Sequence, residues 1–237
     1  MNSSLRSVWQ LLFPPLCPLC GRDVGFCADE PFCPACMADM PPLPASYCPR
    51  CALPFLHSAG IEPHLCSRCI LQPPAFRATY AVGLYQNQLR HAIQRFKYQR
   101  NPHLDVPLAR LLNRVIPEDA QWDLLIPVPM HQARLRQRTY NQSLLLARVI
   151  GRLRQLPVAY KVLVKARPTP PQQTLSAAER RRNLAGAYAL RQPVTDRSIL
   201  LIDDVMTTGV TVELCSRMLL QGGAAQVQVA VLGRAPL

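Results

Sequence analysis

The spacing of apolar positions changes near residue 77. Before that point large apolar side chains are few, and prolines and cysteines are frequent. Residues 79–85 then alternate between apolar and polar or small side chains, which predicts a strand. Apolar residues recur at helical spacing from Leu89 to Phe96. We therefore expect one domain over residues 1–77 and a second over residues 78–237.

Strand-like and helix-like stretches alternate through the rest of the second domain. The pattern predicts strands at 123–128, 162–164, 198–202 and 227–231, helices at 104–115, 133–153 and 211–220, and a capping box at 176–179 that opens a short helix. Strands separated by helices imply an α/β fold with a parallel sheet and right-handed crossovers. Ligands on such sheets bind at the carboxyl ends of the strands, so the loops after Ile126, Val164 and Ile202 are expected to carry chemistry.

Nine of the ten cysteines lie before residue 70, and eight of these nine form CxxC pairs. The pairs are Cys17/Cys20, Cys33/Cys36, Cys48/Cys51 and Cys66/Cys69. Two knuckles separated by about 12–20 residues are typical of a four-thiolate zinc site. We expect two structural zinc ions, with the pairs used in series or interleaved. His57, His64 and Cys27 could substitute for a ligand but are not expected to, and CxxC is poor spacing for a structural disulfide.

Positive charge dominates the composition. The chain carries 27 Lys and Arg against 14 Asp and Glu, a formal net charge of +13. Such an excess favours polyanionic partners: nucleic acid, a membrane surface or phosphorylated small molecules. A membrane span is not expected, because no stretch approaches the roughly 20 apolar residues that a spanning helix needs. The N-terminus has one Arg, a short apolar stretch and no signal cleavage site, so we expect a cytoplasmic protein.

The most informative loop follows the apolar run 199–202. Two acids, Asp203 and Asp204, end the run and precede the turn Thr207–Gly209 and a predicted helix. Adjacent carboxylates at a strand tip can accept hydrogen bonds from the vicinal hydroxyls of a ribose. A turn of small residues at a helix N-terminus offers backbone N–H groups to a phosphate, and Gly209 allows close approach. The loop therefore predicts a site for a ribose 5-phosphate.

These residues resemble a known family. Asp203 to Thr211 is similar to the loop with which type I phosphoribosyltransferases bind phosphoribosyl pyrophosphate (PRPP). The whole chain resembles the ComF/GntX proteins, which are linked with natural competence and the use of imported DNA. The resemblance rests on the CxxC ribbons, FKY at 96–98, PVP at 127–129 followed by Arg134, Arg138, Asn141 and Gln142, TPPQ at 169–172, Ser176 with Arg180 and Asn183, and DDVMTTG at 203–209.

The resemblance implies a type I phosphoribosyltransferase fold and roles for particular residues. Asp203 and Asp204 would contact the ribose hydroxyls and the water shell of a Mg²⁺ ion that accompanies PRPP, and would act as the catalytic acids. The remaining residues implied in PRPP binding are Val205, Thr207, Thr208, Gly209, Val210, Thr211, Val128, Pro129, Arg134, Arg138 and Lys97. The segment 167–183 would be the flexible loop that closes over the site.

Several functions stay open at this level. The acids could stabilise the ribosyl cation of a phosphoribosyltransferase while Mg²⁺ and basic groups neutralise the leaving pyrophosphate. No residue identifies an acceptor base, and glutamine amidotransferase activity is unsupported. The alternatives are a non-catalytic module that binds single-stranded DNA, and a PRPP sensor that presents the ribbons to a DNA-translocating competence helicase.

Overall fold

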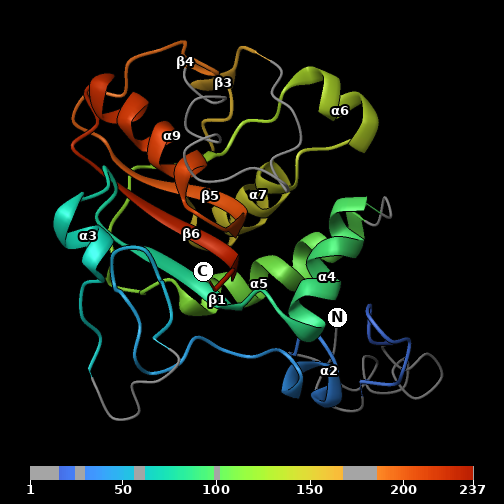
Figure 1. Ribbon diagram of the computed structural model, residues 1–237. Helices are drawn as coiled ribbons and strands as arrows, with labels where there is room; N and C mark the ends of the chain where they lie inside the picture. The colour runs from blue at the N-terminus through green and yellow to red at the C-terminus, as the bar shows by residue number, and fades with distance from the viewer. Residues whose placement is uncertain (1–15, 25–29, 56–61, 99–101, 168–185, 237) are drawn as a thin grey trace.

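A four-stranded parallel sheet forms the centre of the computed structural model (Figure 1), which describes residues 16–24, 30–55, 62–98, 102–167 and 186–236. The strands are β1 (Thr79–Leu84), β2 (Leu124–Pro127), β5 (Ser198–Met206) and β6 (Gln226–Arg234), in the spatial order β1-β6-β5-β2. β5 and β6 pair in parallel over most of their length. The parallel sheet and four of the predicted strands are confirmed.

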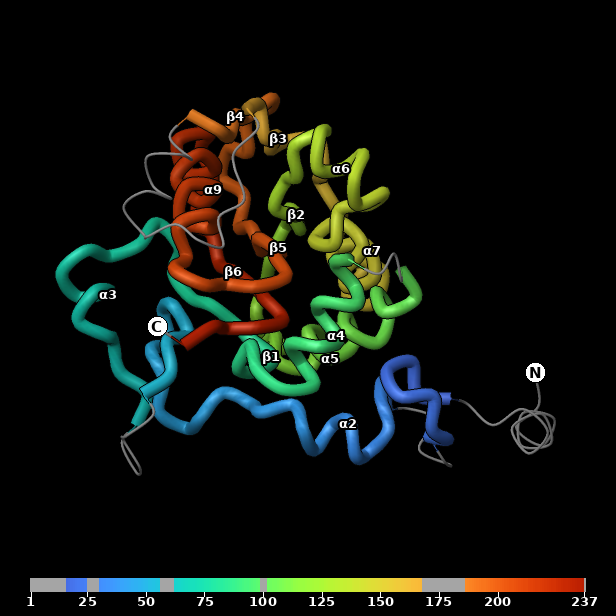
Figure 2. Tube along the Cα trace, turned by 45° about the vertical axis from the view of Figure 1, so that its right-hand side comes forward, coloured from blue at the N-terminus to red at the C-terminus, as the bar shows by residue number. Residues whose placement is uncertain are grey.

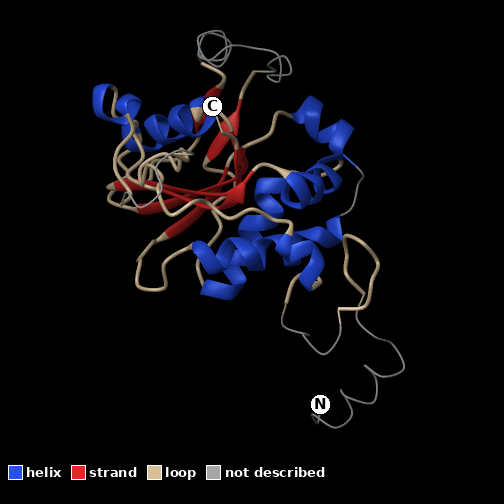
Figure 3. Cartoon of the chain, turned by 60° about the horizontal axis from the view of Figure 1, so that its bottom comes forward, coloured by secondary structure: helices blue, strands red, loops and turns tan. Residues whose placement is uncertain are grey.

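Helices cover both faces of this sheet (Figure 3). The helices α4 (Asn87–Tyr98), α5 (Asp105–Val115) and α7 (Gln142–Arg154) share one buried cluster with Leu200 and Ile202 of β5. On the other face, α9 (Val210–Gln221) shares a second cluster with Ile199 and Leu201. Because successive strand side chains point to opposite faces, the continuous apolar run of β5 feeds both clusters.

The strand expected at 162–164 does not join the parallel sheet. It forms β3 (Leu163–Lys165), which pairs antiparallel with β4 (Tyr188–Leu190) in a separate two-stranded sheet. Leu163 and Tyr188 are buried in the α9 cluster, so this hairpin packs on the α9 side. The apolar pattern of so short a strand carries no information about its partner, and β4 is absent from the predicted elements.

The single helix expected at 133–153 is two helices, α6 (Gln132–Arg138) and α7. Thr139 ends α6 in the left-handed region, at φ 70°. Asn141 then caps α7, where its side chain accepts a hydrogen bond from the backbone N–H of Ser143 at 3.1 Å. The Tyr140 hydroxyl between them donates to the Phe96 carbonyl of α4. This contact with a distant helix accompanies a break that the helical spacing conceals.

The cysteine-rich segments lie along the lower side of the molecule in Figure 2. We call residues 16–40, with the helix α2 (Pro34–Ala38), the first ribbon, and residues 46–71, with the helix α3 (Ser67–Leu71), the second ribbon. The first ribbon packs in the cluster of α4 and α5, and the second ribbon packs in the cluster of α9. The chain between the ribbons runs beside the edge strand β1, where the Pro41 carbonyl accepts from Leu84 N–H at 2.9 Å. The two ribbons thus reach opposite faces of one sheet.

Candidate functional site

Eight cysteines form two groups of four, and in each group the sulfur atoms all lie within 4.8 Å of one another. The groups are Cys17, Cys20, Cys33 and Cys36, and Cys48, Cys51, Cys66 and Cys69. The Sγ···Sγ distance is 3.5 Å between Cys20 and Cys33 and 3.8 Å between Cys51 and Cys66. Zn–S bonds of about 2.3 Å in a tetrahedron need sulfurs about 3.8 Å apart. Both groups therefore fit structural zinc, with the CxxC pairs used in series.

The surroundings favour a thiolate at one sulfur and disfavour it at another. Cys33 N–H points at Cys17 Sγ at 3.4 Å. Burial raises the pKa of Cys51 to about 11, so zinc must displace a proton from this thiol when it binds. His64 is not in either group, because its ring stacks on Phe55 with centroids 4.3 Å apart. Cys27 and His57 lie outside the described residues.

The two acids singled out in the sequence, Asp203 and Asp204, lie within β5, near its carboxyl end at Met206. Asp204 Oδ1 forms an ion pair with Lys97 Nζ of α4 at 2.7 Å. Asp203 Oδ1 accepts from Ser143 Oγ of α7 at 3.0 Å and from Asp204 N–H at 2.9 Å. The acids are thus held by α4 and α7, whose ends meet at the carboxyl edge of the sheet.

Burial changes the proton affinity of this cluster. Burial and the adjacent Asp204 carboxylate raise the pKa of Asp203 to about 7, against the lowering effect of Asp204 N–H, Lys97 and Ser143. Burial alone would lower the pKa of Lys97, but the Asp204 and Asp203 carboxylates outweigh it, so the pKa of Lys97 is raised. At neutral pH the cluster therefore holds the charged ammonium of Lys97, paired with Asp204, beside an Asp203 carboxyl that retains a proton more readily than an ordinary aspartate.

The turn after the acids depends on a glycine in the left-handed region. Gly209 adopts φ 77°, in the left-handed region, and is the N-cap of α9. A Cβ on Gly209 would lie 2.6 Å from Met206 Cε, so both φ and space favour glycine here. Thr207 is exposed and Thr208 is partly exposed. Gly209 and Val210 are buried, so the accessible part of the turn is Thr207 and Thr208, which lie just before the N-terminus of a 12-residue helix, where the helix dipole favours negative charge.

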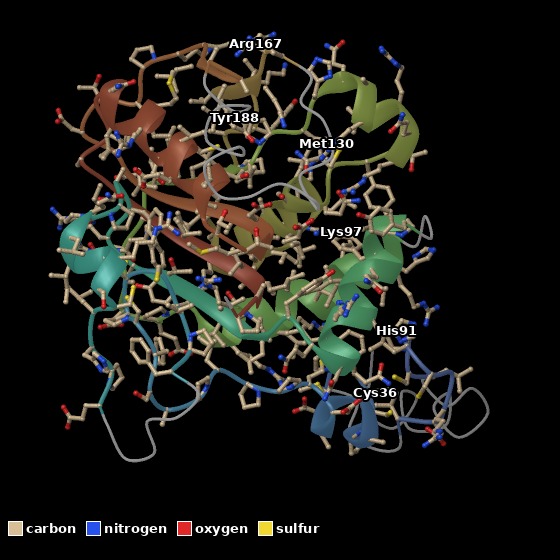
Figure 4. The ribbon with its side chains drawn as sticks, viewed as in Figure 1. Cys36, His91, Lys97, Met130, Arg167 and Tyr188 are labelled. Carbon is tan, nitrogen blue, oxygen red and sulfur yellow. The ribbon has the colours of Figure 1, made fainter. Side chains whose placement is uncertain are left out.

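The loop after β2 lies beside the acids. Val128 N–H donates to the Ile202 carbonyl at 2.9 Å, and the Val128 side chain is buried. Asn141 Nδ2 donates to the Val128 carbonyl at 3.0 Å, which ties this loop to the start of α7. Pro129 and Met130 are partly exposed, and Figure 4 shows Met130 facing the region between α4 and the hairpin. The backbone of this loop can approach a ligand, whereas the side chain of Val128 is buried in the core.

The two α6 arginines lie at different places around the site. The Arg138 guanidinium lies over the Tyr98 ring, 4.7 Å from its centroid, at the end of α4. Arg134 lies close enough to the hairpin to lower the pKa of Lys165. A separate α6 thus places one arginine beside α4 and the other beside β3.

Three residues at the site were not predicted from the sequence: Ser143, Lys165 and Tyr188. Burial, then the positive charge of Arg134, lowers the pKa of Lys165 to about 8, and its Nζ lies 5.5 Å from the centroid of the Tyr188 ring. Burial and the charges of Cys215 and Asp203 raise the pKa of Tyr188. Lys165 follows an apolar strand, which is a weak sequence signal, and nothing local marks the other two. Cys215 is fully buried.

Other expectations fall partly or wholly outside the described residues. The segment 168–183 of the expected flexible loop and the capping box at 176–179 lie there, while Arg167 is described and exposed. Within the described ranges, no helix has both the length and the apolar character needed to cross a membrane.

Family models and relatives agree with this architecture. A double zinc ribbon domain model matches residues 8–70, and a phosphoribosyl transferase domain model matches residues 141–236. The DNA utilization protein YhgH of Escherichia coli O157:H7 is 37% identical over 194 residues, which cover 79% of this chain and 83% of that protein. Competence protein F of Haemophilus influenzae is 31% identical over 217 residues, covering 88% and 92%.

Among solved structures, the glutamine PRPP amidotransferase of Bacillus subtilis covers 58% of this chain and 30% of its own, at 18% identity and a TM-score of 0.41. That similarity is too low to bear on function. The relatives named for DNA utilization and competence confirm the resemblance carried by the motifs, and the two family models confirm the expected pair of domain types. The chain therefore belongs to the ComF/GntX family and joins a double zinc ribbon to a phosphoribosyltransferase domain.

Proposed function

We propose that the carboxyl edge of the sheet binds PRPP with Mg²⁺, in a role connected with the use of imported DNA. The observation that carries the proposal is the order of groups along one short stretch. Two acids lie near the end of β5, which runs to Met206, a turn with Gly209 in the left-handed region follows, and α9 begins at Val210. Hydroxyl acceptors and an anion site are thus fewer than ten residues apart on one rigid edge, as a ribose 5-phosphate requires.

Each end of the ligand would meet matching chemistry. Asp203 and Asp204 would accept hydrogen bonds from the ribose 2- and 3-hydroxyls, and the backbone of Val205 would lie beside the ribose. The 5-phosphate would lie against the turn and the start of α9, that is Thr207, Thr208, Gly209, Val210 and Thr211. Mg²⁺ prefers oxygen ligands and would neutralise the diphosphate, and the two carboxylates suit such an ion or its waters.

The diphosphate would lie toward the loop after β2 and the basic groups around it. Backbone at Val128 and Pro129 would approach the ligand, and Arg134 and Arg138 would contribute charge from α6. Lys165 of the hairpin joins this group, because Arg134 and Asp203 both act on its pKa. Lys97 already neutralises Asp204 at 2.7 Å and would meet the ligand from the α4 side.

Transfer from PRPP would follow from this arrangement. The bond between the anomeric carbon and the pyrophosphate oxygen breaks, and pyrophosphate leaves with the bonding electrons. A nitrogen nucleophile then bonds to that carbon and loses a proton. Asp203 and Asp204 lie where they can stabilise the cationic ribosyl centre. The binding step stands on the geometry above, and an acceptor base is required in addition for turnover.

A second candidate is a binding module that holds single-stranded DNA, or senses PRPP, for a DNA-translocating competence helicase. The net charge of +13 favours it, as does the Arg138–Tyr98 stack beside the site, since Tyr98 is 53% exposed and could stack on a base. Binding driven by phosphate neutralisation weakens steeply with salt. Affinity for single strands that falls steeply as salt rises, without pyrophosphate release, would favour this candidate over the transferase.

Calorimetric titration of PRPP and Mg²⁺ into the zinc-loaded protein tests the main proposal. We expect binding to the native chain and none to the double variant Asp203→Asn, Asp204→Asn, with zinc content unchanged. Asp123→Asn is the matched control, because Asp123 lies just before β2, at the amino edge of the sheet, with its partner Arg197 at 3.5 Å. PRPP binding retained in the double variant would overturn the assignment of this edge.

A further inference from the structure

The end of β6 carries a buried arginine that the proposed ligand site does not use. Arg234 is 1% exposed. Its Nε donates to the Cys51 carbonyl of the second ribbon at 2.8 Å. Its Nη1 donates to the carbonyls of Met206 at 3.2 Å and Thr207 at 2.5 Å, and also to that of Ala235. One guanidinium thus spans from the zinc ribbon to the turn after β5.

The charge of Arg234 needs compensation, because an isolated buried cation is costly. Within the described part of the chain, no carboxylate forms an ion pair with it. Four thiolates around one Zn²⁺ leave a net charge of about −2 on the second ribbon's metal centre. Cys51, whose carbonyl Arg234 contacts, is one of its ligands. The zinc centre is therefore the nearest natural counter-charge for this guanidinium.

A second arginine makes the same connection from the ribbon side. Arg68 lies between the ligands Cys66 and Cys69 in α3, and its Nη1 donates to the Thr208 carbonyl at 2.7 Å. Because Arg68 is part of the CxxC knuckle, the direction of its side chain depends on how the knuckle is folded. A metal that orders the knuckle also orders Arg68.

A cavity of about 390 Å³ lies between the second ribbon and the start of α9, lined by Leu53, Phe76, Val210 and Leu214 among others. Across it, Arg68 and Arg234 reach carbonyls of three successive residues, 206–208. In a backbone nest the carbonyls and the N–H groups face opposite ways. Guanidiniums that hold the carbonyls from behind therefore leave the N–H groups of the turn facing the ligand side.

We propose that the second zinc ribbon, through Arg234 and Arg68, is a positioning element that holds the turn 206–209 in its anion-binding shape. Zinc at the second ribbon and a phosphate ligand at the turn are then thermodynamically coupled. By reciprocity, zinc strengthens ligand binding and the ligand slows zinc loss. The coupling to a ligand rests on the proposed function, whereas the clamp on the turn does not.

Hydrogen exchange of the peptide that covers the turn tests the clamp without any ligand. We expect zinc removal from the second ribbon, by Cys66→Ser in the full chain, to speed exchange at the turn about tenfold. Arg234→Met is expected to do the same with zinc retained. Arg234→Lys keeps the positive charge but loses the planar guanidinium with its several N–H donors. This variant should therefore retain zinc but still show faster hydrogen exchange at the turn. Arg68→Ala is a milder variant, because Arg68 is exposed and its loss leaves the core intact.

Calorimetry and zinc release then test the coupling. Arg68→Ala should weaken PRPP–Mg²⁺ binding about threefold to tenfold. PRPP should slow zinc transfer to a chelator in the native chain but not in Arg234→Met. Arg95→Met is the matched control, because Arg95 donates to the Leu19 carbonyl of the first ribbon at 2.5 Å. Unchanged exchange at the turn in Cys66→Ser and Arg68→Ala would overturn the clamp. Altered exchange without PRPP binding would instead overturn the proposed function and support the clamp.

Discussion

The two zinc ribbons use the same four-cysteine chemistry but join the rest of the molecule in different ways. The first ribbon enters the apolar cluster of α4 and α5, where Phe32 is fully buried. The second ribbon faces a cavity of about 390 Å³ and reaches the turn after β5 through Arg68 and Arg234. Both junctions combine apolar packing with arginine hydrogen bonds, but the arginines of the second junction reach the turn after β5.

This difference teaches that a ligand set alone does not assign a role to a metal site. Apolar packing is non-directional and sums over area, so it contributes to the free energy of unfolding of the whole unit. Guanidinium hydrogen bonds are directional and set the orientation of particular carbonyls. We therefore expect damage to the first ribbon to act on stability, and damage to the second ribbon to act on the turn.

Phe32→Ala should give the largest effect on the first junction. Phe32 is 0% exposed in the α4 and α5 cluster, so its removal leaves a cavity in a shared core. We expect the free energy of unfolding to fall by about 3–5 kcal/mol, measured by urea denaturation of the zinc-loaded protein. Hydrogen exchange at the turn 206–209, corrected for global unfolding, should stay unchanged.

Leu16→Ala is the control within the same ribbon, because Leu16 is 61% exposed and should lose little. A loss of less than about 1 kcal/mol in Phe32→Ala would mean that the first ribbon is not part of the common core. Faster local exchange at the turn would mean that both ribbons act on the site, and the contrast between them would be lost.

The two carboxylates of the site differ in their partners, and pH separates them. Asp204 pairs with Lys97 of α4, whereas Asp203 accepts from Ser143 of α7 and adds to burial in raising the pKa values of Tyr188 and Cys215. Burial and Asp204 raise the pKa of Asp203 to about 7, so its carboxylate forms as pH rises through that value. PRPP–Mg²⁺ affinity should increase about tenfold between pH 6 and pH 8, measured by calorimetry.

The sign for stability without ligand is opposite. The folded chain holds the Asp203 proton more tightly than the unfolded chain, so this contribution is fully present below the ordinary Asp range. It is lost as pH rises through about 7. Because the Ser143 hydrogen bond lowers the pKa of Asp203, Ser143→Ala should move the midpoint of the affinity curve to higher pH. PRPP itself titrates in this range, so the shift between the two proteins is the readout, and an identical midpoint would contradict the assignment.

Features of this molecule that depend on local sequence were predictable. The CxxC spacing identifies all eight zinc ligands, because a thiolate pair in one tight turn needs only four residues of chain. The run 199–202 identifies a central strand and places the two acids at its end. Strand end, turn and helix start are consecutive in the chain, so their juxtaposition needs no knowledge of the fold.

Features that depend on tertiary contacts were not predictable. Arg234 and Cys51 are 183 residues apart in the chain, and Ser143 and Asp203 are 60 apart. The break between α6 and α7 involves a Tyr140 contact with α4, and the apolar period on either side of it is unbroken. The same limit left the CxxC pairing open in the sequence, since series and interleaved arrangements need similar loops.

An exposed ion pair gives the smallest expected effect and sharpens the comparison between the junctions. Arg114 of α5 donates to Glu30 of the first ribbon at 2.8 Å, with side chains 45% and 41% exposed. The Arg114 hydrogen bond lowers the pKa of Glu30, so the pair contributes at neutral pH and is lost as Glu30 protonates in acid. Arg114→Gln should cost less than about 1 kcal/mol of unfolding free energy. The difference should disappear at about 1 M salt, where screening acts within about 3 Å. A larger loss that high salt still removes would show that this charge pair contributes strongly to the junction between the first ribbon and α5, which would bring the two junctions closer in kind.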